Sequence, residues 1–258
     1  MTGVQSLAAA TQLADVAARP GRFALFLDVD GTLIDIAPTP DSVIIPPGLP
    51  ALLKQAKARF GGALALLSGR AIDWLDRRLD AGSLPIGGLH GLERRDAHGK
   101  VERIVTPVFM QQAREDIAAF AYDHPLLLVE DKGLSIALHY RENPGQENAV
   151  RLLMQDLAQR STGTMQAIAG KYLYELRTIG ADKGTALAAF MTAAPFHDRI
   201  PVFFGDDRTD EDGFKVVTAT GGVAVAIGHK PEDVGATIGL QGPADVRAFL
   251  ASVVAEGR

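Results

Sequence analysis

The sequence predicts an α/β chain: a parallel-sheet core with a smaller α+β domain inserted into it. Short, uninterrupted apolar runs alternate with helical patterns in both outer parts of the chain, as in parallel βαβ units. The middle of the chain instead contains hairpin turns and the order α-β-β-α-β-β, which is typical of an antiparallel sheet carrying two helices. The length of 258 residues suits one large domain or two modest ones.

Composition and charge exclude several classes of function. The chain is 47% apolar and 22% charged, which is ordinary for a globular protein, and its formal net charge is −5. That charge gives no electrostatic reason to expect nucleic acid or an acidic membrane as a partner. The absence of cysteine excludes disulfides, thiolate nucleophiles and cysteine zinc sites. No apolar run approaches the length of a membrane span, and the N-terminal residues do not resemble a signal peptide, so we expect a cytoplasmic protein. We also expect a monomer.

The first strand is expected at Phe23–Leu27, an apolar run that should be buried on both faces. It should end near Asp28, since aspartate is a poor strand former. Before it, Leu7–Ala18 is either a short helix or a loose tail, and after it the proline-rich residues 34–50 form a loop. The next expected elements are a helix at Ala51–Phe60, a strand at Ala63–Leu67, a helix at Ile72–Leu79 and a strand at Leu84–Leu89.

The inserted domain is expected at residues 106–178, so that residues 1–105 and 179–258 form the core. Hinges are expected near Thr106-Pro107 and Thr178-Ile179-Gly180. The expected elements of the insert are a helix at Pro107–Tyr122, strands at Leu126–Glu130 and Leu134–Arg141, a helix at Asn148–Gln159, and strands at Met165–Ala169 and Tyr172–Arg177. The core then resumes with a helix at Lys183–Met191, a strand at Pro201–Gly205, a helix at Glu211–Thr218, a strand at Gly222–Gly228 and a helix at Ala244–Val254.

Two carboxylates, Asp28 and Asp30, stand at the expected carboxyl end of the first strand, where open α/β sheets bind their ligands. They would repel each other unless a cation or a shared proton relieves them. A calcium-binding EF-hand loop is excluded, because its sixth and twelfth positions would be Leu33 and Thr39. For this stretch alone, a plain turn after a strand explains the residues equally well.

Three further polar positions are expected at the same edge, and each has two interpretations. Ser68 either caps a helix or binds phosphate at a helix start. Lys183 opens a helix, where a cation is locally unfavourable, so it either forms a salt bridge or binds a phosphate. Asp206 and Asp207 are either an ordinary acidic helix start or hard oxygen ligands that suit Mg²⁺. The chain has no Walker A pattern, no Gly-x-Gly-x-x-Gly and no nucleophile elbow at Ser68.

In this order, the four positions resemble the motifs of haloacid dehalogenase superfamily phosphatases. The resemblance implies a Rossmann-like core, and the long gap between Ser68 and Lys183 resembles the site of that superfamily's second-type cap insertion. The chain more closely resembles the trehalose-6-phosphate phosphatase family, nearly throughout residues 23–228. The residues that carry this resemblance are Asp28-Val29-Asp30-Gly31-Thr32, Ser68-Gly69-Arg70, Gly88-Leu89-His90-Gly91-Leu92-Glu93, Val129-Glu130-Asp131-Lys132-Gly133, His139-Tyr140-Arg141, Glu175 to Lys183-Gly184, and Gly205-Asp206-Asp207-Arg208-Thr209-Asp210-Glu211. Thr178-Ile179 stands where the family often has proline after arginine.

The resemblance implies a Mg²⁺-dependent hydrolase of trehalose biosynthesis that hydrolyses trehalose 6-phosphate through an aspartyl-phosphate. It implies Asp28 as nucleophile, Asp30 as general acid and base, and Ser68 and Lys183 as stabilisers of phosphoryl charge. It implies metal binding by Asp28, the backbone carbonyl of Asp30, and Asp206, with Asp207 orienting a bound water. The implied substrate-binding residues are Gly69, Arg70, His90, Glu130, Lys132, His139, Arg141, Lys171 and Glu175.

Other interpretations stay open at the level of sequence. Charged residues on a hairpin are usually a solvated face, and a lone histidine such as His90 is more often structural. The substrate of a capped sugar phosphatase could also be sucrose phosphate or a mannosyl-glycerate phosphate. A catalytically inactive sugar-phosphate-binding subunit should lack Asp28 or Asp30, and both are present. A magnesium-dependent phosphotransferase would differ mainly in using a sugar instead of water as acceptor.

Overall fold

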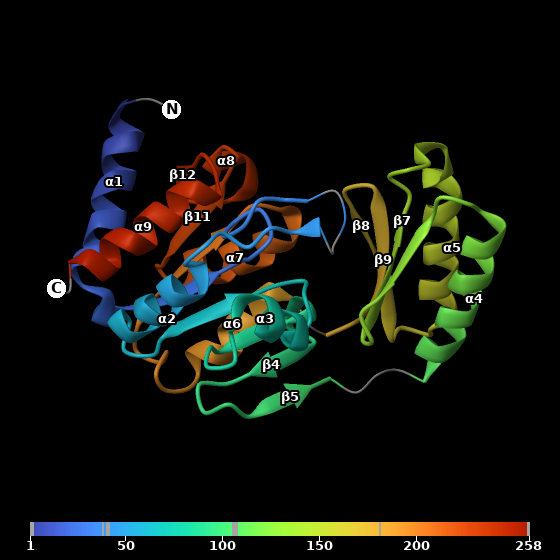
Figure 1. The fold of residues 1–258 in the computed structure, drawn as a ribbon, viewed down its shortest axis with the longest axis horizontal. Helices are drawn as coiled ribbons and strands as arrows, with labels where there is room; N and C mark the ends of the chain where they lie inside the picture. The colour runs from blue at the N-terminus through green and yellow to red at the C-terminus, as the bar shows by residue number, and fades with distance from the viewer. Residues whose placement is uncertain (1–2, 38, 40–41, 105–107, 181, 257–258) are drawn as a thin grey trace. The chain divides into compact units, whose positions relative to one another are not determined.

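The computed structural model describes residues 3–37, 39, 42–104, 108–180 and 182–256 (Figure 1). The chain divides into two compact units. One comprises Met1–Glu102 and Asp182–Arg258, and the other comprises Arg103–Ala181. The first contains a mostly parallel sheet and the second a separate antiparallel sheet, so the predicted fold class is confirmed.

The sheet of the first unit has the strand order β12-β11-β10-β1-β2-β3-β4-β5. The pairings from β12 to β3 are parallel, and β3 pairs with β4 in antiparallel fashion. The central strand is β1, which lies between β10 and β2. The strands are β1 Phe23–Leu27, β2 Leu64–Leu67, β3 Ile86–Gly88, β4 Glu93–Arg95, β5 Val101–Arg103, β10 Ile200–Gly205, β11 Val223–Ile227 and β12 Ile238–Leu240.

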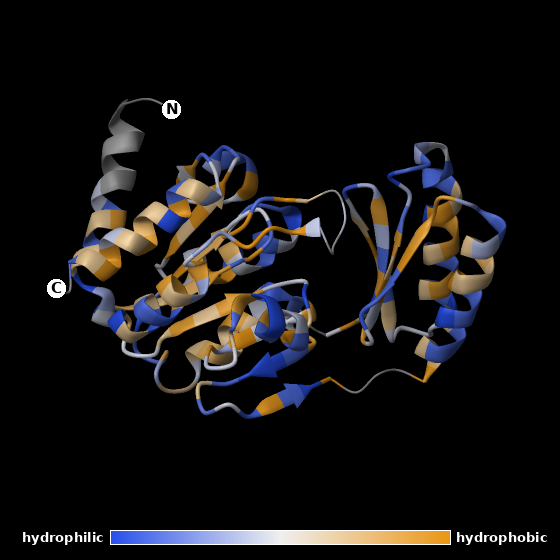
Figure 2. Cartoon of the chain, viewed as in Figure 1, coloured by the Kyte–Doolittle hydropathy of each residue, from blue (hydrophilic) through white to orange (hydrophobic). Residues whose placement is uncertain are grey.

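Helices cover both faces of this sheet, which is why its central strands are uninterrupted apolar runs. Leu25 and Leu27 of β1 belong to one buried cluster, and Phe26 belongs to the other. The first face is covered by α1 Gly3–Ala18, α2 Leu49–Arg59, α3 Ile72–Leu79 and α9 Pro243–Ala255, and the second by α6 Lys183–Met191 and α7 Glu211–Ala219. A short helix, α8 Pro231–Val234, precedes β12. The central strands consist mostly of hydrophobic residues, whereas the residues of β4 are hydrophilic (Figure 2).

The second unit has the predicted order α-β-β-α-β-β, with a sheet in the order β6-β7-β9-β8. Residues of both helices pack with Ile136, Leu138 and Leu176 in a buried cluster on one face of this sheet. Because side chains alternate along a strand, Ala137, His139 and Glu175 face the other way. The elements are α4 Phe109–Asp123, β6 Leu128–Asp131, β7 Ser135–His139, α5 Glu147–Arg160, β8 Met165–Gly170 and β9 Leu173–Thr178.

Several element predictions need correction. The N-terminal helix begins at Gly3, four residues before the predicted segment, and β3 is shorter than the predicted strand. The hairpin of β4 and β5 was not predicted, because its residues are mostly charged and show no apolar pattern, although Glu93 and Arg95 of β4 are buried. The expected hinge at Thr106-Pro107 lies outside the described residues. Among the residues that the structure describes, none of the helices combines the length and the apolar character that crossing a membrane requires.

Candidate active site

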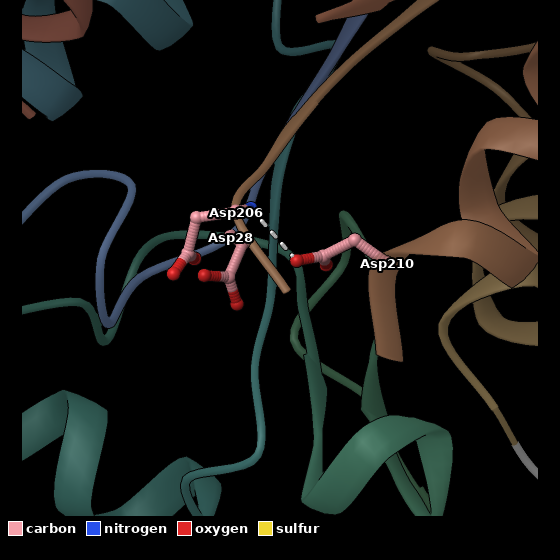
Figure 3. Close-up of side chains that lie close together, drawn as sticks. All are labelled: Asp28, Asp206 and Asp210. Carbon is pink, nitrogen blue, oxygen red and sulfur yellow. Dashed lines mark hydrogen bonds between the residues drawn. The ribbon is translucent and has the colours of Figure 1, made fainter. Parts of the chain in front are cut away.

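Three aspartates converge at the carboxyl ends of β1 and β10: Asp28, Asp206 and Asp210, hereafter the aspartate cluster (Figure 3). Asp28 follows β1 and Asp206 follows the neighbouring parallel strand β10, so the sheet brings the two residues to one edge. Asp210 stands at the N-cap of α7. One carboxylate oxygen from each residue lies within 4.8 Å of the others. Asp28 and Asp206 therefore lie close together as predicted, and the carboxylate of Asp210 joins them.

Local backbone contacts hold the aspartate cluster in place. Gly31 has a φ of +88°, and a Cβ added to it would lie 2.0 Å from a carboxylate oxygen of Asp206, so only glycine fits this turn. The hydroxyl of Thr32 donates to Asp206 Oδ1 at 3.1 Å. Asp210 Oδ2 accepts from the backbone N–H groups of Asp206 and Asp207 at 2.9 and 3.0 Å. Asp210 thereby organises the loop that presents Asp206.

Lys183 brings a positive charge into this site. Its Nζ donates to Asp28 Oδ1 at 2.7 Å and to Asp210 Oδ1 at 2.6 Å, and all three side chains are buried. Asp182 caps α6 and accepts from the backbone N–H of Thr185 at 2.7 Å. The salt bridge that was one interpretation of Lys183 is therefore present, and it explains how a cation tolerates the first turn of a helix.

The electrostatics of the aspartate cluster favour binding of a cation. Burial raises the pKa of Asp28 well above its usual range, although Lys183 opposes the shift. Burial and the neighbouring Asp210 raise the pKa of Asp206 to about 7, and burial raises that of Asp210 to about 8. Burial alone would lower the pKa of Lys183, but Asp210 and Asp28 raise it. Three carboxylates share one lysine, so the residues present fit a divalent cation held by hard oxygen ligands.

The pH dependence of stability without metal tests this charge imbalance. A carboxyl group with a raised pKa binds its proton more tightly in the folded state, so folding loses stability as pH rises through that pKa. In EDTA, between pH 5.5 and 8, the wild type should lose about 2 kcal/mol more of its free energy of unfolding than Asp206→Asn does. Urea unfolding at both pH values measures the difference, and saturating Mg²⁺ should remove it. Parallel pH profiles in EDTA would contradict the expectation.

Asp30 lies outside the aspartate cluster, because its side chain is bonded to Arg70. Arg70 Nε donates to Asp30 Oδ2 at 2.9 Å, and Nη2 donates to Oδ1 at 2.7 Å. The guanidinium group of Arg70 lies 4.3 Å from the centre of the Trp74 ring. Asp207 is exposed, and its Oδ1 accepts from the backbone N–H and hydroxyl of Thr209.

Ser68 is buried at the end of β2, and its hydroxyl accepts from the backbone N–H of Arg70 at 3.1 Å. The interpretation of Ser68 as a helix cap is wrong, because the N-cap residue of α3 is Ala71. The backbone N–H of Ile72 donates to a carboxylate oxygen of Glu93 at 3.0 Å, so Glu93 caps α3 from a distant part of the chain.

Gly69 and His90 pack against each other beside Ser68. A Cβ at Gly69 would lie 2.7 Å from His90 Nε2, so the close approach of the ring requires glycine there. His90 is buried and has a φ of 55°, in the left-handed region that a non-glycine residue adopts only at a cost. Its backbone N–H donates to the carbonyl of Ser68 at 2.9 Å. The chain segments that carry Ser68, Gly69 and His90 therefore pack directly against each other in the first unit.

In the second unit, four of the predicted sugar-binding residues form one polar network. His139 Nε2 lies 3.0 Å from Glu130 Oε2, and Lys132 Nζ lies 3.3 Å from Glu175 Oε1. The hydroxyl of Ser135, a residue not predicted, donates to Glu175 Oε1 at 2.6 Å.

Arg141 and Lys171 lie outside this network. Arg141 follows the end of β7, and its guanidinium lies 5.7 Å from the centre of the Tyr172 ring. Lys171 is exposed at the turn between β8 and β9. The structure therefore brings together four of these six predicted residues.

Sequence reasoning also missed the role of Asp210. The residue lies in an acidic run, and its place three positions after Asp207 was the signal that could have marked it as a helix cap. Its bond to Lys183 joins residues 27 positions apart, and spacing alone does not predict that contact.

The chain matches the model of the trehalose-phosphatase family over residues 26–243. It belongs to this family. It is 41% identical over 211 residues to the trehalose-6-phosphate phosphatase of Escherichia coli K12, which covers 80% of this chain and 78% of the relative. It is 40% identical over 206 residues to a probable trehalose-phosphate phosphatase of Sinorhizobium fredii, with the same coverage of the two chains.

The solved structure of the Candida albicans trehalose-6-phosphate phosphatase C-terminal domain has the same fold, with a TM-score of 0.82 at 20% identity. It covers 97% of this chain and 96% of that one. Another similar structure comes from a phosphatase of the haloalkanoate superfamily, with a TM-score of 0.59 at 20% identity, covering 89% and 93% of the two chains. Family membership makes the chain an enzyme, a trehalose-phosphate phosphatase, and confirms the family predicted from the motifs.

Proposed function

We propose that the chain hydrolyses trehalose 6-phosphate to trehalose and inorganic phosphate, with Asp28 as nucleophile and Mg²⁺ as cofactor. The observation that carries the proposal is the buried contact of Asp28 with Lys183 beside Asp206 and Asp210, in a member of the trehalose-phosphatase family. A carboxylate nucleophile next to a buried cation suits attack on an anionic phosphate ester.

The proposed reaction has two steps. In the first, an oxygen of Asp28 bonds to phosphorus, the bond from phosphorus to the sugar oxygen breaks, and Asp30 donates a proton to that oxygen. In the second, water attacks the aspartyl-phosphate, Asp30 takes a proton from the water, and the bond from phosphorus to Asp28 breaks. The products are trehalose and phosphate, and both carboxyl groups return to their starting forms.

Mg²⁺ would be held by Asp28, Asp206 and the backbone carbonyl of Asp30, with Asp207 orienting a bound water. When bound, the ion neutralises negative charge on the carboxylates and the phosphoryl oxygens. Asp210, which is closer to Lys183, supports the loop that carries Asp206.

Lys183 and Ser68 would stabilise the charge on the transferring phosphoryl group, in a site where their positions are set before the substrate binds. Lys183 is buried between two carboxylates, so its ammonium group is already oriented. Gly69 and His90 lie beside Ser68 and would contact the substrate.

The inserted domain, proposed as a cap of residues 106–178, would bind the disaccharide part of the substrate. The polar network of Glu130, Lys132, His139 and Glu175 supports this role, since charged groups on one face of a sheet can bond several sugar hydroxyls. Arg141 and Lys171 would contribute from outside the network. The proposal includes a cytoplasmic monomer with a small-molecule sugar phosphate as substrate and with neither nucleic acid nor membrane as a partner, and sedimentation analysis would check the oligomeric state.

Phosphate release from three esters tests the proposed substrate. With Mg²⁺, trehalose 6-phosphate should be hydrolysed much faster than sucrose 6-phosphate or glucose 6-phosphate, and EDTA should abolish all release. Equal turnover of the three esters would leave a phosphatase without the named substrate. No release from any ester would favour a protein that only binds sugar phosphates.

Replacing Glu130 tests the sugar-binding role of the inserted domain. Glu130→Ala should lower kcat/KM for trehalose 6-phosphate by about 10-fold to 10²-fold, since a lost hydrogen bond to a charged group is worth that much. Hydrolysis of p-nitrophenyl phosphate, which has no sugar, should change little. Glu142→Ala, at an exposed position in the same domain, is the matched control. Equal losses for both esters would argue against a sugar contact by Glu130.

A further inference from the structure

We propose that Arg70 is a positioning residue, which holds the Asp30 carboxylate in the orientation needed for hydrolysis of the aspartyl-phosphate. The inference rests on the proposed function, in which Asp30 takes a proton from the attacking water. It gives Arg70 a role different from the substrate contact that the family resemblance implies.

The ion pair of Arg70 and Asp30 constrains the carboxylate fully. The two N–H···O bonds measure 2.9 and 2.7 Å, and each carboxylate oxygen accepts one of them. The side chain of Arg70 is 14% exposed and that of Asp30 is 30% exposed. A two-point contact of this kind fixes the plane of the carboxylate as well as its distance, which a single contact from a lysine cannot do.

Arg70 is itself held on several sides. Its guanidinium group lies over the Trp74 ring, and Trp74 is a half-buried residue of α3 that packs against the main hydrophobic core. Its backbone N–H donates to the hydroxyl of Ser68 at 3.1 Å, and its carbonyl accepts from the backbone N–H of Leu89 at 3.0 Å. The core therefore holds Trp74 in place, Trp74 holds the guanidinium group of Arg70, and Arg70 orients the Asp30 carboxylate.

This arrangement matters most for the second chemical step. There, water loses a proton to an oxygen of Asp30, its own oxygen bonds to phosphorus, and the bond from phosphorus to Asp28 breaks. Asp30 must act as a base on a small molecule, so its orientation decides whether the water is aligned for attack. In the first step Asp30 protonates the leaving group. A p-nitrophenolate leaving group hardly requires this proton, because the anion is stable without it.

The test therefore uses p-nitrophenyl phosphate with Mg²⁺ and follows both steps after rapid mixing. Arg70→Lys keeps the charge but loses the two-point contact, and Trp74→Leu keeps an apolar side chain at the core but removes the aromatic stacking surface. Both variants should form the aspartyl-phosphate, seen as a burst of p-nitrophenolate and as acid-trapped phosphoenzyme. Their steady-state kcat should fall by about 10-fold to 10²-fold, and KM should fall with it, because slowing only the second step leaves kcat/KM unchanged.

Three further variants complete the comparison. Asp30→Asn should accumulate phosphoenzyme to the greatest extent. Trp74→Phe keeps an aromatic surface and should retain most of the activity. Arg77→Lys, at an exposed position of the same helix, should behave as the wild type does.

The outcomes separate this inference from the proposed function. If Asp30→Asn turns over normally, the role proposed for Asp30 is wrong. If Asp30→Asn accumulates phosphoenzyme but Arg70→Lys and Trp74→Leu only raise KM, Arg70 is a substrate contact and the inference is overturned.

A second measurement does not depend on activity. Trp74 is the only tryptophan, so its fluorescence reports on the stacking, and its emission should shift in Arg70→Lys. Unchanged emission in Arg70→Lys would mean that the guanidinium does not stack in solution, which would also overturn the inference. Circular dichroism would confirm that each variant is folded.

Discussion

Asp28→Asn is expected to lower kcat for trehalose 6-phosphate by roughly 10⁴-fold or more, because an amide cannot form the aspartyl-phosphate. The fold should survive the change, since the amide has the same shape and its oxygen can still accept from Lys183. In EDTA the variant should be at least as stable as the wild type, because it removes one of three crowded carboxylates. Phosphate release with saturating Mg²⁺, together with thermal unfolding in EDTA, measures both effects.

The matched control is Asp35→Asn. Asp35 is exposed and lies seven residues further along the chain, so its replacement should leave both activity and stability unchanged. Deamidation of the new asparagine would restore aspartate, so mass spectrometry should accompany the assay. Near-normal turnover in a preparation free of deamidated protein would remove Asp28 from the role of nucleophile.

Lys183→Met is expected to damage both stability and activity. The change removes the buried cation between Asp28 and Asp210 and leaves two buried carboxylates without it. Breaking a buried ion pair on one side costs about 3–5 kcal/mol of stability, and loss of a group that stabilises transition-state charge lowers kcat by about 10²-fold to 10³-fold. Chemical unfolding in EDTA and phosphate release with Mg²⁺ measure the two effects. Mg²⁺ should restore part of the stability, because it supplies positive charge to the same carboxylates.

Lys215→Met provides the matched control for this prediction. Lys215 is 70% exposed and pairs with Asp212 on the surface of α7, so its loss should change neither quantity measurably. If Lys183→Met unfolds with the same free energy as the wild type in EDTA, the buried ion pair does not contribute to folding. If Lys183→Met keeps full activity, Lys183 has no part in phosphoryl transfer.

The sequence alone predicted the α/β fold class, with a parallel-sheet core and a separate antiparallel α+β part, and the family. The physical reason is local. A strand buried on both faces must be an apolar run, as in Phe23–Leu27, and a strand end that carries ligands is marked by polar residues such as Asp28 and Ser68. Each of these signals lies within a few consecutive residues, so it can be read without knowing the tertiary structure.

Edge elements escaped prediction for the opposite reason. The strands β4 and β12 lie near the ends of the sheet order, and the polar β4 has no local hydrophobic pattern. Their pairing depends on the neighbours that the fold provides. In the same way, the cap of α3 is Glu93, which follows Ile72 by 21 positions, so the local interpretation of Ser68 as the cap was wrong.

The sequence by itself determined which carboxylates stand at the edge of the sheet, since Asp28, Asp30, Asp206 and Asp207 all follow apolar strands. Only the tertiary structure decided which of these carboxylates pair with a basic side chain, and with which one. It places Lys183 between Asp28 and Asp210, and it pairs Asp30 with Arg70. The reason is that charge pairing in a folded chain depends on distances between side chains from different strands and helices. Those distances arise from packing and cannot be read from spacing along the sequence.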